Sequence, residues 1–491
     1  MPDVINVEGV EVDTRHWIDG SRVASERTFT DISPIDEAML GEIARGTAAE
    51  IDAAVGAAHR AFPAWRDLGA QGRSEVLHRV ADGIEARAEE LVRVETRDNG
   101  SLLRSHRRSV MPRVGMNFRA FADRVRELGE QLEVRGHRER ITWDPAGVCA
   151  IITPWNAPLM LATWRIGPAL AAGNTVVFKP PEWAPLTASL LADITRDAGM
   201  PDGVFNVVQG LGAEAGAPLT AHPGIRRLSF TGSVPTAGTV AAAAAPNIVP
   251  LSFELGGKSP LIVFDDADLE LAVSLAVEQF DNAGQVCLGA FRILVHDSLH
   301  DQFVEAVVER AARLVQGDPR DETTDVSALV SRPHFERVSG FVERALRSGA
   351  RPLLGGGPNT ELGGLFFQPT ILTDVKSDCE IVTEEVFGPV LTVQTFSTER
   401  EAVDMANDTR FGLAATLITG DPERAERVSA QLTAGTVWVN CFFVRDLGAP
   451  FGGSGHSGIG REGGIWSFDF YCDIKNTVFG PSGWTIAEGS N

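Results

Sequence analysis

The sequence predicts an α/β protein with two doubly wound α/β domains and a small bridging β-sheet. Its 491 residues are too many for one compact core, because domains usually hold about 100 to 200 residues. From residue 147 onward, short apolar runs alternate with segments of helical periodicity, and the alternation restarts after Glu254. Such alternation predicts βαβ units in parallel sheets, with ligands at the carboxyl ends of the strands.

The first domain begins with helical patterning. Between Ala48 and Asn99 the apolar residues recur at helical spacing, which predicts two amphipathic helices separated around residues 65–72. Buried strands are then predicted at 147–153, 175–178, 204–209 and 227–231, and helices at 164–172, 186–198 and around the alanine run 240–245. Gly173 and Asn174 supply a stop signal for the first of these helices.

The second domain is predicted from about 255 to 440. Strands at 261–264 and 292–295 alternate with helices at 269–280 and 299–314. Two further segments fit neither domain: 128–142 is charged and alternating, and 468–491 is strand-like. Together they predict a small protruding sheet.

Composition and charge exclude several partners. The formal charge of −22 disfavours nucleic acid and anionic membrane surfaces, which are bound by basic patches. The most apolar stretch, 148–164, is interrupted by two prolines and closed by Arg165, so no membrane span is predicted. An anionic substrate would need a local positive site.

The five cysteines are widely spaced, without a C-x-x-C pair or a Cys/His cluster of zinc-ligand spacing. No disulfide framework and no metal site are therefore expected. The first thirty residues lack a basic start and an apolar core, so no secretory signal is expected and the predicted location is the cytoplasm.

Two turns after predicted strands are candidates for holding a nucleotide. A strict G-x-G-x-x-G is absent, although Gly210, Gly212 and Gly216 come close. In Phe230-Thr231-Gly232-Ser233, Ser233 can cap a helix whose free N–H groups would bind a pyrophosphate. Lys179 and Glu182 can hold ribose hydroxyls, and an acidic group there favours NAD over NADP. An ordinary strand-to-helix turn and a solvated turn remain the alternatives.

Three residues have side chains suited to catalysis. Cys287 lies in a glycine-containing loop after a helix and is either a nucleophile or a small buried apolar residue. Glu254 ends a mostly apolar run beside two glycines, where a buried carboxylate would be a general base or would pair with a neighbour. Asn156, between two prolines at a strand end, can donate to an oxyanion or cap its own turn.

The ordered motifs TPWNAP, ALAAGNTVVFKPPE, FTGS, FELGGKSP, GQVC, EEVFGPV and PFGG strongly resemble the NAD(P)-dependent aldehyde dehydrogenase superfamily. The resemblance extends from Trp17 to Asn476. It implies an aldehyde dehydrogenase-like fold with an atypical Rossmann site, which accounts for the missing glycine fingerprint. It also implies that the protruding sheet pairs subunits into a homodimer or homotetramer.

The resemblance assigns a role to each matching residue. Cys287 matches the nucleophile, Glu254 the general base and Asn156 the oxyanion donor. The cofactor-binding residues it implies are Ile152, Thr153, Pro154, Trp155, Lys179, Glu182, Gly212, Phe230, Thr231, Gly232, Ser233, Leu255, Gly256, Glu385 and Phe387. The implied domains are an NAD-binding domain (1–127 and 143–253), a catalytic domain (254–440), an oligomerisation sheet (128–142 and 468–491) and a substrate-entrance segment (441–467).

Chemistry supports the same roles. An aldehyde does not release hydride until a nucleophile has made its carbon tetrahedral, and a Cys287 thiolate would do so. The resulting oxyanion would be held by Asn156 and the Cys287 N–H, and a thioester would remain for Glu254 and water to hydrolyse. The sequence thus predicts oxidation of a small aldehyde to an acid with NAD.

The substrate is predicted from a narrower resemblance. The stretches around 112–123 and 444–471 look most like the subgroup that acts on muconic semialdehydes, such as 2-hydroxymuconate and 2-aminomuconate semialdehyde. Arg113 and Arg445 match the two arginines that clamp the distal carboxylate, with Asn156 and Phe451 as further substrate contacts.

Several readings of the substrate site remain open. Arg113 could instead be a surface residue and Arg445 could pair with Asp446. Departures at Gly448-Ala449 and Gly455-His456 suggest a different aldehyde. The alternatives are a dehydrogenase of neutral aromatic or aliphatic aldehydes, a thiol esterase without redox chemistry, and a non-catalytic protein on the same fold.

Overall fold

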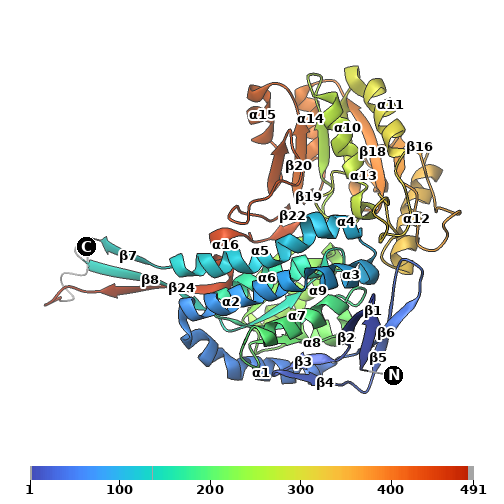
Figure 1. Ribbon diagram of the computed structural model, residues 1–491. Coiled ribbons are helices and arrows are strands. Elements are labelled where there is room, and N and C mark those ends of the chain that lie inside the picture. Colours follow the sequence, from blue (N-terminus) through green and yellow to red (C-terminus); the bar gives the residue numbers. More distant parts are fainter. Residues whose placement is uncertain (1–2, 135–136, 485–491) are drawn as a thin grey trace.

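A twisted eight-stranded sheet forms the centre of the first α/β body (Figure 1). The computed structural model describes residues 3–134 and 137–484. In the sheet order β23-β13-β12-β9-β10-β11-β3-β4, the five strands from β13 to β11 are parallel. These five are β9 (Val148–Ile152), β10 (Thr175–Lys179), β11 (Phe205–Val207), β12 (Arg227–Gly232) and β13 (Leu251–Leu255). Most of their side chains are buried because helices cover both faces, which confirms the predicted α/β class.

The N-terminal segment supplies antiparallel strands. β3 (His16–Ile18) pairs with β11 and with β4 (Ser21–Val23). Two hairpins flank them, β1 (Val4–Val7) with β2 (Val10–Asp13) and β5 (Thr28–Ile32) with β6 (Met39–Ala44).

The helices of this body correct two predictions. The segment expected to hold two helices forms three, α1 (Ala48–Asp67), α2 (Gly69–Ala86) and α3 (Ala88–Asn99), because the breaks at Leu68 and Arg87 are single residues that leave the apolar stripe continuous. α6 (Pro158–Ala172) begins six residues before the predicted start, since proline is tolerated at the first helical position. The others are α4 (Leu103–Ser105), the π-helix η1 (His106–Val110), α5 (Met111–Arg124), α7 (Leu186–Asp197), α8 (Ala217–Ala221) and α9 (Val234–Ala244).

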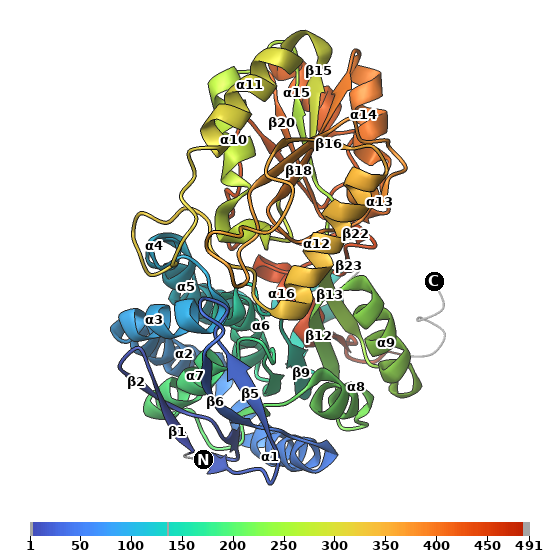
Figure 2. The ribbon, with the colours of Figure 1, turned by 90° about the vertical axis from the view of Figure 1, so that its right-hand side faces the viewer.

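A second α/β body lies above the first in Figure 2. Its seven-stranded sheet has the order β16-β17-β18-β15-β14-β20-β21 and is parallel except for β16. The strands are β14 (Pro260–Val263), β15 (Arg292–His296), β16 (Arg351–Leu354), β17 (Thr370–Thr373), β18 (Val390–Phe396), β20 (Ala414–Ile418) and β21 (Thr436–Val439). The helices are α10 (Leu269–Glu278), α11 (His300–Ala311), α12 (Arg332–Arg347), α13 (Glu380–Thr383), α14 (Glu399–Asn407) and α15 (Pro422–Ser429).

The predicted protruding sheet is present and projects from the first body (Figure 1). It joins β7 (Glu130–Val134), β8 (His137–Pro145) and β24 (Cys472–Phe479), all antiparallel. The prediction of strand from 468 was wrong for its first four residues, which lie in α16 (Gly464–Tyr471) because Phe468 and Tyr471 are buried in the core. Residues 135–136 and 485–491 of the predicted segments lie outside the described part.

The chain returns from the second body to the first before α16. β22 (Ser454–Gly455) pairs with β19 (Phe411–Gly412) in the second body, and β23 (Gly458–Ile459) then pairs with β13. In this pairing Gly458 lies opposite Glu254, so the last part of the chain supports the strand that carries this carboxylate. Among the described residues, no helix combines the length and apolar character that crossing a bilayer requires.

Trp65 joins α1 to α6 and provides a test of this packing. Its indole is fully buried and donates a hydrogen bond to the Leu170 carbonyl at 3.0 Å. Trp65→Ala should lower the free energy of unfolding by about 3–5 kcal/mol, as large-to-small core substitutions do. Urea unfolding followed by circular dichroism measures this. Leu68→Ala, at a side chain 45% exposed, is the control, and equal midpoints for the two variants would contradict the assignment.

Candidate active site

Cys287 lies on a loop whose backbone is unusually constrained. The loop follows α10 and the 3-10 turn η5 (Asp281–Gly284), in which Asn282, Ala283 and Gly284 have φ angles of 50°, 52° and 70°. A Cβ at position 284 would lie 2.2 Å from the Gly388 carbonyl oxygen, so only glycine fits there. The loop is thereby packed directly against the 384–389 segment.

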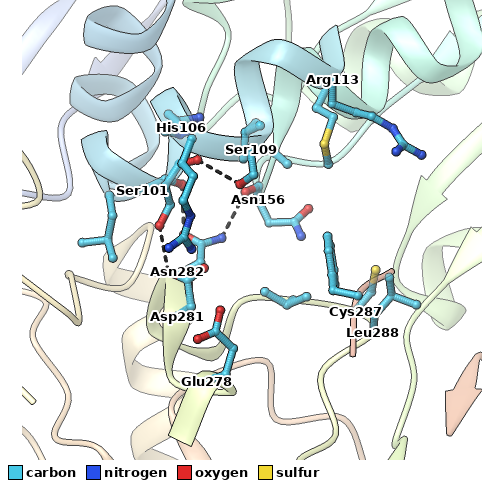
Figure 3. Close-up of a pocket in the computed structure, with 18 of the residues that line it drawn as sticks. Ser101, His106, Ser109, Arg113, Asn156, Glu278, Asp281, Asn282, Cys287 and Leu288 are labelled. Carbon is cyan, nitrogen blue, oxygen red and sulfur yellow. Dashed lines mark hydrogen bonds between the residues drawn. The ribbon is translucent and has the colours of Figure 1, made fainter. Parts of the chain in front are cut away.

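A cavity of about 410 Å³ lies between the two bodies, beside this loop (Figure 3). Its lining includes four residues singled out from the sequence, Cys287, Asn156, Arg113 and Arg445. The apolar part of the remaining wall is formed by Leu102, Val110, Ala157, Met160, Leu161, Val286, Leu288, Phe442 and Phe443, and the polar part includes Arg108, Glu278 and Asp281. The structure therefore brings a thiol, an amide and two guanidinium groups into one space that also holds further charged side chains of both signs.

The Asn156 side chain is held in place beside Cys287. Its Nδ2 donates to the Gln285 carbonyl at 2.9 Å, and Figure 3 shows the amide directed toward the side of the cavity that holds Cys287. Because a primary amide carries two N–H donors, one remains for a ligand. This geometry suits an oxyanion donor.

Glu254 lies at the end of β13 and is buried. Burial and the nearby charge of Glu462 raise the pKa of its carboxyl well above the usual value, against the opposing charges of Arg165 and Arg445. Neither carboxylate oxygen has a hydrogen-bond partner within residues 3–134 and 137–484. Glu254 does not line the cavity, but its charge acts on Cys287.

Arg165 and Glu462 are functional candidates that the sequence analysis missed. Both are buried, and Arg165 Nη2 lies 3.3 Å from Glu462 Oε2. They place one further carboxylate and one guanidinium group near Glu254. A charged residue within the apolar helix 158–172 was the available signal for Arg165, whereas nothing in the sequence linked Glu462 to Glu254.

The Cys287 thiol is neutral in this environment. Burial raises its pKa to about 12, and the negative charges of Glu385 and Glu254 add to the effect. Attack by this sulfur therefore needs a base to take its proton. A buried carboxylate with a raised pKa is chemically able to do so.

Arg113 and Arg445 are adjacent, and neither is paired with Asp446 through an ion pair in the described part of the chain. Arg113 Nη1 donates to the Arg445 carbonyl at 3.2 Å, and both guanidinium groups lie over the Trp164 ring at 5.7 and 5.4 Å. Burial and the charge of Arg113 lower the pKa of Arg445 to about 10. The prediction that Arg113 could be a mere surface residue is wrong, because it lines the cavity.

Phe451 does not line the cavity, so the structure does not place it against a substrate. Its ring instead lies 3.8 Å from the Arg445 guanidinium carbon. This close stacking holds the charged group in position. Phe451 was assigned to the substrate because it is near Arg445 in the sequence. The sequence does not show that the Arg445 side chain covers the Phe451 ring.

The residues predicted to bind a dinucleotide lie along the carboxyl ends of four parallel strands. β9 ends at Ile152, followed by Thr153, Pro154 and Trp155. β10 ends at Lys179, and Glu182 follows three residues later. β12 ends with Phe230, Thr231 and Gly232, followed by Ser233, and β13 ends at Leu255, followed by Gly256. Gly212 begins a π-helix after β11, with space toward Glu182. Glu385 and Phe387 come from the second body.

Details of this edge suit a dinucleotide. Lys179 Nζ and Glu182 Oε2 are 2.7 Å apart, and although burial opposes it, the Lys179 charge lowers the pKa of Glu182. Ser233 caps α9 by accepting from Thr236 N, as predicted. The buried hydroxyls of Thr153 and Thr231 have no partner in the described residues. Glu385 Oε1 accepts from Gly257 N at 3.1 Å, and a Cβ at Gly256 would collide with the same carboxylate.

The comparisons with known proteins agree with this geometry. The family model described as "Aldehyde dehydrogenase family" matches residues 17–477. The chain belongs to the aldehyde dehydrogenase family. This aldehyde dehydrogenase is 44% identical over 479 residues to 2-hydroxymuconic semialdehyde dehydrogenase of Pseudomonas sp. (strain CF600), covering 94% of this chain and 98% of that one. It is 40% identical to human 2-aminomuconic semialdehyde dehydrogenase, covering 94% and 96% of the two chains.

Solved structures share the fold. The HpcC protein of Thermus thermophilus superposes with a TM-score of 0.92 at 43% identity, covering 95% of this chain and 93% of that one. Betaine aldehyde dehydrogenase of Staphylococcus aureus, solved in complex with NAD+, gives a TM-score of 0.94 at 36% identity, covering 98% and 97%. The predicted aldehyde dehydrogenase-like fold and the enzyme class are confirmed.

The charge of Glu462 should control the protonation of Glu254. Glu462→Gln removes a like charge, which lowers the pKa of Glu254, so the base stays ionised to lower pH. The acidic limb of the kcat profile should shift down by about one pH unit, the size of effect that a neighbouring charge produces. Initial rates between pH 5 and 9 measure it. Glu426→Gln, on the exposed face of α15, is the control, and an unmoved acidic limb in Glu462→Gln would disprove the coupling.

Proposed function

We propose that this aldehyde dehydrogenase uses NAD to oxidise a carboxylated semialdehyde, such as 2-hydroxymuconate semialdehyde from aromatic catabolism, to the dicarboxylic acid. The observation that carries the proposal is the pair Arg113 and Arg445, which lines the same cavity as Cys287 and Asn156. Relatives that are named muconic semialdehyde dehydrogenases support it. The two arginines provide the local positive site that a chain of charge −22 needs for an anionic substrate.

The reaction begins at Cys287. Glu254, whose pKa is raised by burial and by Glu462, takes the thiol proton, directly or through water, and the sulfur adds to the aldehyde carbon. The carbonyl oxygen becomes an oxyanion that the free N–H of Asn156 stabilises, an interaction worth about 3 kcal/mol per donor. The product of this step is a thiohemiacetal on Cys287.

The residues at the carboxyl ends of β9, β10, β12 and β13 would hold NAD. When bound, its nicotinamide ring accepts the hydrogen and two electrons that the thiohemiacetal carbon loses. Lys179 and Glu182 would bind a ribose, with Glu182 repelling the 2′-phosphate of NADP. The Ser233-capped start of α9 would receive the pyrophosphate, and Glu385 a second ribose.

The thioester left on Cys287 is then hydrolysed. Glu254, after passing its first proton to solvent, takes a proton from water, whose oxygen adds to the acyl carbon. The carbon–sulfur bond breaks, the acid leaves, and Cys287 recovers its proton. The same carboxylate thus serves both half-reactions.

The arginine pair would bind the end of the substrate opposite the aldehyde. Guanidinium groups meet a carboxylate through two parallel hydrogen bonds, and burial strengthens the pairing. The apolar wall suits the conjugated carbon chain between the two ends. A dehydrogenase of neutral aldehydes is the alternative, favoured by the apolar residues of that wall and by its Glu278 and Asp281 carboxylates, which would repel an anion; a thiol esterase would use Cys287 and Glu254 without NAD.

We also propose the domain roles. Residues 1–127 and 143–253 would form the NAD-binding domain, 254–440 the catalytic domain and 441–467 the substrate-entrance segment. The sheet of β7, β8 and β24, which replaces the predicted 128–142 and 468–491, would pair subunits into a homodimer or homotetramer, which its exposed Ile474 and Val478 support. The cytoplasm is the proposed location, and neither nucleic acid nor membrane is a proposed partner.

Removing one arginine should lower kcat/KM more for carboxylated substrates than for neutral ones. In Arg445→Ala, kcat/KM for 2-hydroxymuconate semialdehyde should fall about 100-fold, since a buried charge pair is worth about 2–5 kcal/mol when one partner is removed. The value for benzaldehyde should fall less, about ten-fold, because loss of the Arg445 charge also raises the pKa of Glu254 and of Cys287. Rates with NAD and NADP, measured in parallel by absorbance, test substrate and cofactor preference together.

Arg119→Ala is the matched control, because Arg119 is on the same helix as Arg113 but forms ion pairs with Asp82 and Glu85. Equal kcat/KM for the two aldehydes in the wild type, or no loss in Arg445→Ala, would favour the neutral-aldehyde alternative. Hydrolysis of p-nitrophenyl acetate without NADH formation from any aldehyde would favour the esterase.

Glu254→Gln should separate the two half-reactions. The first turnover should survive, because other bases and solvent can deprotonate the thiol over seconds, whereas hydrolysis of the thioester should fail. Stopped-flow absorbance should show a burst of about one NADH per active site, and mass spectrometry a trapped acyl group on Cys287. Steady turnover near the wild-type rate would contradict the role of Glu254.

A further inference from the structure

Asn282 connects the two loops that carry Asn156 and Cys287 (Figure 3). Its Nδ2 donates two hydrogen bonds, one to the Asn156 carbonyl at 3.1 Å and one to the Gln285 carbonyl at 3.4 Å. Its Oδ1 accepts from Ser101 Oγ at 2.9 Å. Asn282 belongs to the second body, whereas Ser101 and Asn156 belong to the first, so one side chain links both.

We infer that Asn282, held by Ser101, is a positioning residue that fixes the Asn156 amide relative to the Cys287 sulfur. The inference rests on the proposed function in so far as Asn156 and Cys287 are the reacting groups. Asn282 and Ser101 line the cavity themselves; Asn282 would nevertheless act through Asn156, by holding its loop, and not through a bond to the substrate.

The hydrogen bonds cross between the loops in both directions. Asn282 reaches the backbone of Asn156, and Asn156 reaches the backbone of Gln285, two residues before Cys287. Gln285 in turn donates from Nε2 to the Asn282 carbonyl at 3.1 Å. Sliding one loop along the other would break several of these bonds together, so the relative position of the amide and the sulfur is determined by all of them.

The backbone conformation of Asn282 is one that surrounding contacts have to hold in place. Asn282 and Ala283 both have left-handed φ angles near 50°, a conformation that is unfavourable for residues with a Cβ. Asparagine tolerates it better than most residues, but alanine has no such preference. Consecutive left-handed residues persist where surrounding contacts over-determine the backbone, as at functional sites. The contacts of Asn282 supply that constraint.

The other end of the linkage is anchored at the C-terminus of α3. Asn99 Nδ2 donates to the Trp155 carbonyl at 3.3 Å, and its Oδ1 accepts from Ser101 N at 2.9 Å. Glu95 Oε2 accepts from Leu159 N at 3.2 Å. α3 therefore holds both flanks of Asn156 and also Ser101, and Ser101 holds Asn282.

Asn282→Asp tests the inference directly. Aspartate keeps the shape, the tolerance of left-handed φ and the acceptor for Ser101, but it removes the N–H donor. kcat/KM should fall about 100-fold, the effect of displacing a catalytic group by about 1 Å, while NAD affinity and the melting temperature stay near wild type. Ser101→Ala, which removes only the hydroxyl, should give a smaller loss of about 10-fold.

A double-mutant cycle decides whether Asn282 acts through Asn156. In the Asn156→Ala background, Asn282→Asp should lower kcat/KM by less than about two-fold, since the side chain that Asn282 positions is gone. If the loss of kcat/KM in the double variant equals the product of the losses in the two single variants, Asn282 does not act through Asn156 and the inference is overturned. Asn407→Asp is the matched control: Asn407 Nδ2 donates to the Gln431 carbonyl and its Oδ1 accepts from Thr433 N, far from the cavity, and its kcat/KM should equal that of the wild type.

Hydrogen exchange gives a readout that does not depend on activity. In Asn282→Asp and Ser101→Ala, amides in both 153–158 and 281–287 should exchange faster, because the linkage holds both loops. Faster exchange confined to 281–287 would show a merely local role and overturn the inference. If the wild type oxidises no aldehyde, the proposed function fails, and the exchange result still decides whether Asn282 joins the loops.

Discussion

The active site depends on the burial of several charged groups that balance one another where water has little access. Glu254 and Glu462 are two carboxylates in one buried neighbourhood, and Arg165 and Arg445 act on both. In a medium of low dielectric constant each charge acts strongly on the others. The protonation state of Glu254 is therefore a property of the whole group, and so is the neutrality of the thiol. A substrate carboxylate beside Arg113 and Arg445 would change this balance at the moment of binding.

The buried parallel strands of the first sheet and two strands of the second, at 261–264 and 292–295, could be predicted from sequence, because fully buried parallel strands leave continuous apolar runs. The Ser233 cap and the loop position of Cys287 followed from local rules in the same way. The antiparallel strands of the N-terminal segment and the later strands of the second sheet were not predicted individually. The third N-terminal helix and the helical start of 468–471 could not be predicted from local pattern. There the breaks are single residues, and burial of Phe468 and Tyr471 against distant elements decides the conformation.

The candidate site was predictable to the extent that its residues lie at strand ends or in motifs. Arg165 and Glu462 were missed because only a contact between residues 297 positions apart makes them partners. The role of Phe451 stays a prediction. The sequence places it near Arg445, but only the fold shows that its ring stacks on the guanidinium and packs in the same apolar cluster as Cys287. The second sheet also departs from the rule for parallel sheets, since Cys287 and Glu385 precede β15 and β18 and so lie near their amino ends.

The pairing of β23 with β13 has a consequence for synthesis of the chain. The strand that carries Glu254 gains its outer neighbour only when residues 458–459 have been made, more than 200 residues later. A ribosome adds about 5–20 residues per second, so this edge of the first sheet waits at least about ten seconds for its partner. Contacts of such long sequence separation form late in folding. A nascent chain that ends before Gly458 therefore leaves β13 without this neighbour beside Glu254.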